Sequence, residues 1–114
     1  MTVVDKPYAG GRWSEAKMKS FVRSTLRRAF LRWPVRSDAL TAARRPQQGR
    51  SARTKWEYCC ASCGGWFLGS EVQVDHIIPA GSLDDVTQFV GRLFCEEDGL
   101  QILCAGCHQC KTNR

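Results

Sequence analysis

The sequence predicts an α+β fold with a helical arm at its N-terminal end. Apolar residues recur at helical spacing over residues 14–33, strand-like segments cover residues 56–58, 71–75 and 100–104, and two Cys-x-x-Cys pairs frame the second half. At 114 residues the chain suits one small domain, whose core alone is only marginally stable. A structural metal would therefore add useful folding energy.

Charge divides the chain into a basic half and an acidic half. Residues 1–57 carry 14 Lys/Arg against 4 Asp/Glu, and residues 58–114 carry 3 against 7. A basic arm on an acidic, cysteine-bearing module suits a polyanionic partner, nucleic acid first. The alternative is a solvated helical face, because charge patterning alone is weak support. The sequence shows neither a signal peptide nor a long apolar run, so we expect a cytoplasmic protein without membrane contact.

Residues 1–55 are predicted to form the basic helical arm and a linker. Ser14 is the candidate N-cap of the first helix, and Pro34 ends its pattern. A shorter helix is expected from about residue 37 to residue 45. Residues 46–55 show no apolar periodicity and are expected to be a linker or mobile basic loop. The apolar face comprises Met18, Phe21, Val22, Leu26, Ala29, Phe30 and Trp33. The basic face comprises Lys19, Arg23 and Arg27, flanked by Arg28 and Arg32.

Residues 56–114 are predicted to form the second, cysteine-bearing domain. A strand leads into the first cysteines, a turn follows at Gly64-Gly65, and a second strand reaches Asp75. A helix over residues 82–94 is expected to begin with a capping box made by Ser82 and Asp85. A short strand at "LQILC" then enters a final helix. The buried stripe expected for the 82–94 helix is Leu83, Val86, Phe89, Val90, Leu93 and Phe94.

Four cysteines have the spacing of a structural zinc site. Tetrahedral Zn²⁺ takes four thiolate or imidazole ligands, and two Cys-x-x-Cys pairs supply them. The expected ligands are Cys60, Cys63, Cys104 and Cys107. Cys59 is an alternative to Cys60 with a wider spacing. We otherwise assign the remaining cysteines to packing or to the surface: Cys59, Cys95 and Cys110.

The interval between the two cysteine pairs contains the only Asp-His pair, Asp75-His76. Zinc would bring the second pair beside the first, so that His108 approaches the end of this strand. A carboxylate and two imidazoles suffice for hydrolysis: a hard divalent ion polarises a phosphoryl oxygen while a neutral histidine deprotonates water. The alternative is a core histidine at position 76 and a second histidine that merely supports a thiolate.

Three segments together resemble a known family: "CASCGGWF", "EVQVDHIIPAGSL" and "GLQILCAGCHQCKT". They are similar to the HNH endonucleases of the small zinc-stabilised bacteriophage type, over residues 56–112. The N-terminal "RWSEAKMKSFVRSTLRRAFLRWP" also resembles the arm of that group. The resemblance implies a ββα-metal (His-Me finger) core and metal-dependent hydrolysis of DNA phosphodiesters, by nicking or by double-strand cleavage.

The resemblance also implies roles for individual residues. His76 would be the general base, and Asp75 and His108 would ligate the catalytic divalent ion, Mg²⁺ or Mn²⁺. Lys111 would contact phosphate, although a solvated lysine is the alternative. Four arginines of the arm would grip backbone phosphates away from the cut: Arg23, Arg27, Arg28 and Arg32.

The chain departs from the family at Gly99, where most members place Asn before the "LQ-x-LC" strand. Asp98 as a ligand, or backbone carbonyls that hold His76, are the candidate replacements. The expected partners are DNA and other phage proteins such as packaging components, with the chain a monomer or homodimer. The main alternative is a non-catalytic zinc-ribbon module that binds DNA. A zinc-stabilised adaptor for another phage protein is a third reading.

Overall fold

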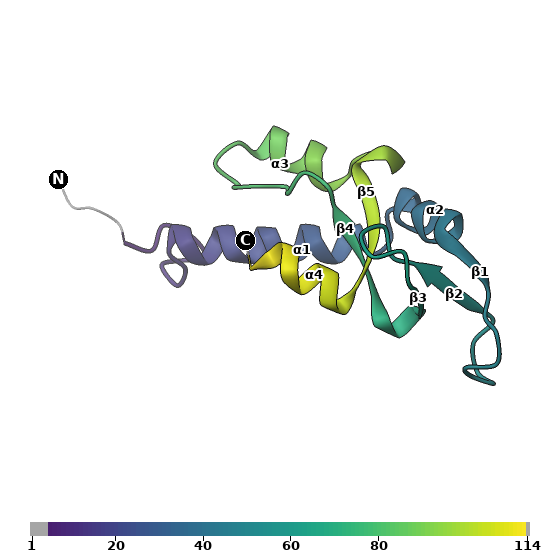
Figure 1. Cartoon of the computed structure of the whole chain (residues 1–114). Coiled ribbons are helices and arrows are strands. Elements are labelled where there is room, and N and C mark those ends of the chain that lie inside the picture. Colours follow the sequence, from purple (N-terminus) through teal and green to yellow (C-terminus); the bar gives the residue numbers. More distant parts are fainter. Residues whose placement is uncertain (1–4, 114) are drawn as a thin grey trace.

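The computed structural model describes residues 5–113, which form four α-helices and two small antiparallel sheets (Figure 1). The predicted α+β class is confirmed at this level. The helices are α1 Glu15–Phe30, α2 Pro34–Ala43, α3 Val86–Leu93 and α4 Ala105–Thr112. The strands are β1 Arg44–Pro46, β2 Trp56–Cys59, β3 Trp66–Leu68, β4 Val72–His76 and β5 Leu100–Cys104. Two 3₁₀ turns, η1 Gly69–Glu71 and η2 Glu97–Gly99, precede β4 and β5.

The N-terminal half contains two consecutive helices. Helix α1 begins where its cap predicts, because the Ser14 hydroxyl accepts a hydrogen bond from the Lys17 amide at 3.2 Å. Helix α2 begins at Pro34, earlier than expected, and ends at Ala43. Proline ends one helix but also suits the first position of the next, where its missing N–H is not needed. The helix thus begins and ends earlier than the 37–45 range that the sequence predicts.

A three-stranded antiparallel sheet follows, in the order β1-β2-β3. Strand β1 was not predicted, and it pairs with β2 from Arg44↔Tyr58 to Pro46↔Trp56. The intervening basic loop contains no helix or strand, as expected, but Gln47 organises it. The Gln47 side chain accepts hydrogen bonds from the backbone of Arg50 and Ser51 and donates to Thr54. The β1–β2 pairing thus joins the two regions that the sequence suggested dividing at residue 55.

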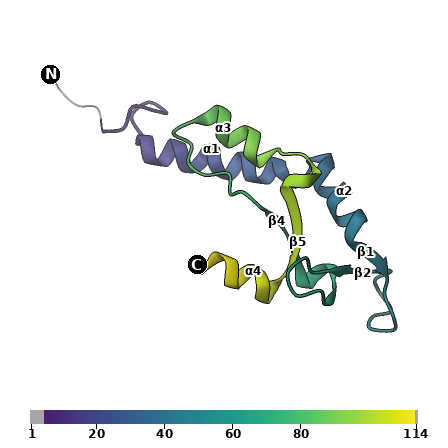
Figure 2. The same ribbon diagram turned by 45° about the horizontal axis from the view of Figure 1, so that its top comes forward.

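The second sheet consists of β4 and β5 alone, paired over five residues. Its register runs from Val72↔Cys104 at one end to His76↔Leu100 at the other. Helix α4 continues directly from β5 and packs against both strands, while α1 and α3 lie toward the opposite end of the strand pair (Figure 2). This arrangement places the N-terminal end of α4 near the cysteines and its later turns near the end of β4.

Helix α3 is shorter than the sequence predicted. It begins at Val86, and its N-cap is Asp85, which accepts a hydrogen bond from the Gln88 amide at 3.1 Å. The predicted capping box with Ser82 is wrong, because the Ser82 hydroxyl bonds the Asp84 amide instead. Phe89 and Leu93 are fully buried, whereas Val86 and Val90 are exposed.

The main core lies between α1, α2, α3 and the β4/β5 pair. Its buried members include Phe30, Ala39, Leu83, Phe89, Leu93 and Ile102. The molecule is elongated: its radius of gyration is 18.2 Å, against about 13 Å for a compact chain of this length. The N-terminal part of α1 extends along this long dimension (Figure 1), and Phe21, expected to pack, is half exposed there. No helix within residues 5–113 has the length and apolar character needed to cross a bilayer.

Candidate functional site

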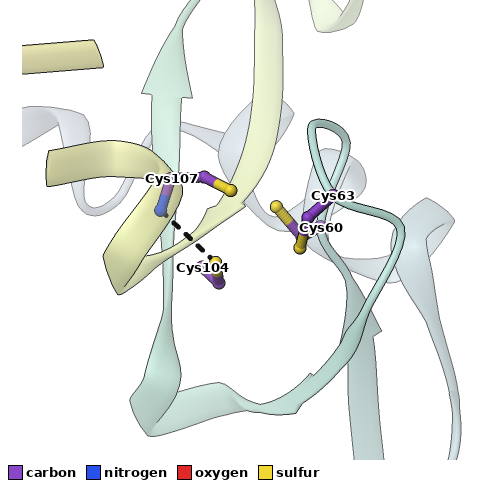
Figure 3. Close-up of side chains that lie close together, drawn as sticks. All are labelled: Cys60, Cys63, Cys104 and Cys107. Atoms are coloured by element: carbon purple, nitrogen blue, oxygen red, sulfur yellow. Dashed lines mark hydrogen bonds between the residues drawn. The ribbon is translucent and has the colours of Figure 1, made fainter. Parts of the chain in front are cut away.

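The four predicted cysteine ligands converge on one point. The Sγ atoms of Cys60, Cys63, Cys104 and Cys107 all lie within 4.8 Å of one another, a grouping that can hold a metal ion. Figure 3 shows one pair coming from the loop after β2 and the other from the start of α4. The alternative ligand Cys59 is not in the cluster, and its thiol points to the Gly64 carbonyl.

Local backbone geometry prepares these cysteines for a metal. Gly64 has φ +76°, which allows the tight turn that brings Cys63 back toward Cys60. Burial raises the pKa of the Cys60 thiol, but hydrogen bonds from neighbouring backbone groups, led by Cys63 and Cys104, lower it to about 6. Thiolates are the form in which cysteine binds metals. Within the cluster, the lowered pKa favours a thiolate at Cys60, whereas side-chain hydrogen bonding with Cys104 raises the pKa of the Cys107 thiol to about 12.

A second group of candidate functional side chains lines a cavity of about 500 Å³ between α1, β4, α3 and α4. In Figure 2, α1 and α4 lie on either side of β4, which carries the Asp-His pair. The residues that line the cavity include Arg27, Phe30, Gln73, Asp75, His76, Leu93, His108 and Lys111. The structure thus brings together Asp75, His76 and His108, as the sequence predicted.

Asp75 is 8% exposed, and its two carboxylate oxygens have different neighbours. Oδ2 accepts hydrogen bonds from the Gln101 amide at 2.9 Å and from the Lys111 ammonium at 2.5 Å. Oδ1 lies 3.6 Å from Nε2 of His108. One oxygen is therefore held by protein donors, while the other faces an imidazole nitrogen across the cavity.

His76 is held by two contacts that fix both its position and its tautomer. Its Nε2 lies 2.8 Å from the carbonyl oxygen of Leu93, and the centroid of its ring lies 4.6 Å from the centroid of the Phe30 ring. A carbonyl only accepts hydrogen bonds, so Nε2 of the neutral ring carries the hydrogen and Nδ1 keeps a lone pair. His76 is therefore oriented with one nitrogen able to accept a proton.

His108 owes its position to the cysteine cluster. Cys104 is the N-cap of α4, and its sulfur accepts a hydrogen bond from the Cys107 amide at 3.4 Å. His108 follows Cys107 directly, so anchoring the first turn of α4 also sets the direction of this imidazole. The prediction that the second cysteine pair carries His108 toward Asp75 matches this placement.

The four arginines predicted to bind DNA do not occupy equivalent places on α1 and its C-terminal end. All four are exposed, and none is paired with a carboxylate within residues 5–113. Arg27 lines the cavity that contains His76, whereas Arg23, Arg28 and Arg32 do not. The expectation that all four lie away from the Asp75-His76 pair therefore fails for Arg27.

Gly99 occupies a position with no room for a side chain. A Cβ atom there would lie 2.8 Å from Sγ of Cys95 and 3.1 Å from its Cβ. The Gly99 carbonyl accepts a hydrogen bond from the Ile77 amide at 2.9 Å, which joins the segment after β4 to η2. Asp98 lines a different pocket, beside Ile78 and Arg92, and does not line the cavity that contains His76.

Three features of the cavity lining were not predicted from the sequence: Phe30, Leu93 and the inward position of Lys111. Nor was Gln101, which does not line the cavity but donates a hydrogen bond to Asp75. Gln101 had a recognisable signal, because the β4/β5 register places it directly opposite Asp75. The other contacts join distant parts of the chain and follow no local pattern.

Comparisons of the chain with protein-family models, with curated proteins and with solved structures find no match.

Proposed function

We propose that this protein is a metal-dependent DNA endonuclease that hydrolyses phosphodiester bonds, with β4, β5 and α4 as a ββα-metal core. One observation carries the proposal. A single cavity holds the Asp75 carboxylate facing the His108 imidazole, next to a histidine whose Nδ1 is available as a base. Nicking and double-strand cleavage are both compatible with one such cavity per chain.

The donors in the cavity fit a hard divalent cation. Two coordination bonds of about 2.1 Å span at most about 4.2 Å, and Oδ1 of Asp75 lies 3.6 Å from Nε2 of His108. Mg²⁺ and Mn²⁺ are the candidates, because carboxylate, water and phosphate oxygens suit them. When bound, such an ion supplies Lewis acidity toward a phosphoryl oxygen and stabilises the departing oxygen.

His76 is the proposed general base. Its Nε2–H donates to the Leu93 carbonyl, so Nδ1 is the nitrogen that takes a proton from water. The ring of Phe30 limits rotation of the imidazole. The Leu93 carbonyl thus provides the orienting contact that Gly99, without a side chain, does not.

Arg27 is the proposed contact to the phosphate in the cavity, because a guanidinium recognises phosphate oxygens through paired hydrogen bonds. Arg23, Arg28 and Arg32 extend the positive charge along the arm and would contact backbone phosphates with little sequence preference. The four-cysteine cluster, with Zn²⁺ as its proposed ion, keeps α4 and therefore His108 in place.

A non-catalytic DNA-binding module is the second candidate, and the surroundings of Asp75 favour it. The carboxylate already has an ammonium and an amide donor without any ion, as a purely structural aspartate would. In that reading the Asp75–Lys111 pair joins β4 to α4 and has no role in chemistry. Cleavage distinguishes the two candidates, because a binding module shifts DNA mobility without altering supercoiled plasmid.

The test compares wild type with His76→Ala, both loaded with zinc and assayed on supercoiled plasmid with Mg²⁺ or Mn²⁺. We expect nicking by wild type and a loss of about 100-fold or more in the variant, the usual range for a general base. Circular dichroism and a DNA mobility shift control for folding and binding. Tight, salt-sensitive binding without nicking in either metal would reject the nuclease and favour the binding module.

A further inference from the structure

Lys111 points into the protein, and its ammonium group has three oxygen acceptors. Nζ lies 2.5 Å from Oδ2 of Asp75, 2.6 Å from the carbonyl oxygen of His76 and 3.4 Å from that of Ile77. The side chain reaches this position because Lys111 follows His108 by about one turn of α4 and lies on the same face. The Lys111 ammonium is therefore bonded to groups of the protein itself, whereas the family resemblance implied that it contacts a DNA phosphate.

Lys111 makes the net charge of the cavity lining positive. Asp75 is the only carboxylate among the described residues that line it, while Arg27 and Lys111 are both cationic. With neutral imidazoles, the lining therefore carries an excess of one positive charge. A divalent cation that approaches Oδ1 of Asp75 meets a carboxylate whose charge is already compensated on its other oxygen.

We propose that Lys111 is the internal counter-charge of Asp75 and keeps the cation site weak until a phosphodiester enters the cavity. The inference rests on the proposed nuclease function and adds a dependence of ion binding on substrate. A phosphodiester brings the missing negative charge and further oxygen ligands. Mg²⁺ in particular is commonly held by few carboxylates together with substrate phosphates. Lys111 is thus a positioning residue, acting through Asp75.

The surroundings of Asp75 allow the charge of Lys111 to be tested separately from its structural role. Gln101 donates to Oδ2 at 2.9 Å independently of Lys111, so we expect the carboxylate to keep this anchor when Lys111 is replaced. Lys111→Gln removes the charge and keeps a hydrogen-bond donor. Lys111→Arg keeps the charge and is the matched control. A structural loss weakens ion binding, so tighter binding in Lys111→Gln is a result that disruption alone does not produce.

The first experiment measures Mn²⁺ affinity by titration followed by electron paramagnetic resonance, with zinc-loaded protein and no DNA. We expect Lys111→Gln to bind Mn²⁺ at least tenfold more tightly than wild type, and Lys111→Arg to remain within about threefold of wild type. Unchanged or weaker Mn²⁺ binding by a folded Lys111→Gln protein would overturn the proposal.

A second experiment needs no variant and covers the case in which Lys111→Gln does not fold. Mn²⁺ affinity of wild type is compared with and without a hydrolysis-resistant phosphorothioate duplex, after subtracting Mn²⁺ bound by the duplex alone. We expect at least tenfold tighter binding with the duplex, and equal affinities would overturn the proposal. Tighter Mn²⁺ binding by Lys111→Gln in a protein that never nicks DNA would remove the nuclease function alone. Nicking by wild type with no such change in Lys111→Gln would remove only the role of Lys111.

Discussion

The two ends of the β4/β5 pair carry two different kinds of candidate metal site. At one end, opposite Val72, Cys104 belongs to a cluster of four sulfur donors within 4.8 Å of one another. At the other end, next to His76, Asp75 and His108 offer two donors 3.6 Å apart beside a cavity of about 500 Å³. The four sulfur atoms could fill all coordination positions of a tetrahedral ion. The two donors of the second site would leave coordination positions for water or substrate.

In the proposed function, this difference separates a structural role from a chemical one. Four soft donors around one point satisfy a tetrahedral ion fully, which suits folding and excludes reaction. A carboxylate and an imidazole next to the proposed base and two cations leave room for a phosphate, which is compatible with the proposed hydrolysis. The five-residue β4/β5 ladder and the first turn of α4 connect the sites, so the cluster can support the cavity without taking part in its chemistry.

The largest effect is expected from breaking the cluster with Cys104→Ser. The change removes one of four ligands at a buried position, and structural zinc binding contributes on the order of 10 kcal/mol to folding in small domains. We expect loss of the cooperative thermal transition and of near-ultraviolet circular dichroism, and the same loss in wild type on strong chelation.

The matched control for that change is Cys110→Ser, at an exposed cysteine of α4, the helix that Cys104 caps; Cys110 lies outside the cluster. Its stability should stay within about 0.5 kcal/mol of wild type. Similar melting curves for Cys104→Ser and Cys110→Ser would contradict a structural role for the cluster.

A smaller effect is expected from Arg27→Ala. This change tests whether the cavity, unlike the cysteine cluster, takes part in the chemistry. Arg27 lines the cavity while its neighbour Arg28 does not, although both are exposed on α1. We expect Arg27→Ala to lower kcat for plasmid nicking roughly tenfold or more, because a donor to the reacting phosphate is lost. Arg28→Ala should instead raise KM and reduce the salt dependence of binding by about one phosphate contact.

Steady-state kinetics over a range of salt concentrations measure both arginine variants. Equal changes in kcat for Arg27→Ala and Arg28→Ala would show that the cavity position of Arg27 has no special role in the chemistry.

An effect on stability alone is expected from Gly99→Asn, which tests the cavity end of the strand pair. The new Cβ would lie 2.8 Å from Sγ of Cys95, so the neighbouring segment must shift. We expect a loss of about 1–3 kcal/mol in the free energy of unfolding, typical of overpacking. Denaturant titration measures it, and the double variant Cys95→Ala/Gly99→Asn should recover part of the loss. If the double variant is no more stable than Gly99→Asn alone, the contact with Cys95 is not the cause of the lost stability.

Local patterns were sufficient to predict several elements. The cap at Ser14, the strands at β4 and β5 and the four-cysteine cluster depend on residue spacing and on short-range hydrogen bonds. The start of α2 and the pairing of β1 were not predicted. The first follows from the double role of Pro34, and the second requires a partner strand ten residues further along the chain.

Residue identity and spacing were enough to identify the available groups: four cysteines at matched spacing, one Asp-His pair, a second histidine beside a cysteine and a basic arm. The way in which Asp75, His76 and His108 face one another became visible only in the fold. There Lys111 bonds to Asp75, Arg27 lines the cavity and His76 uses Nε2, not Nδ1, to bond the Leu93 carbonyl. Residue spacing sets local geometry, whereas contacts between α1, β4, α3 and α4 depend on how distant segments pack.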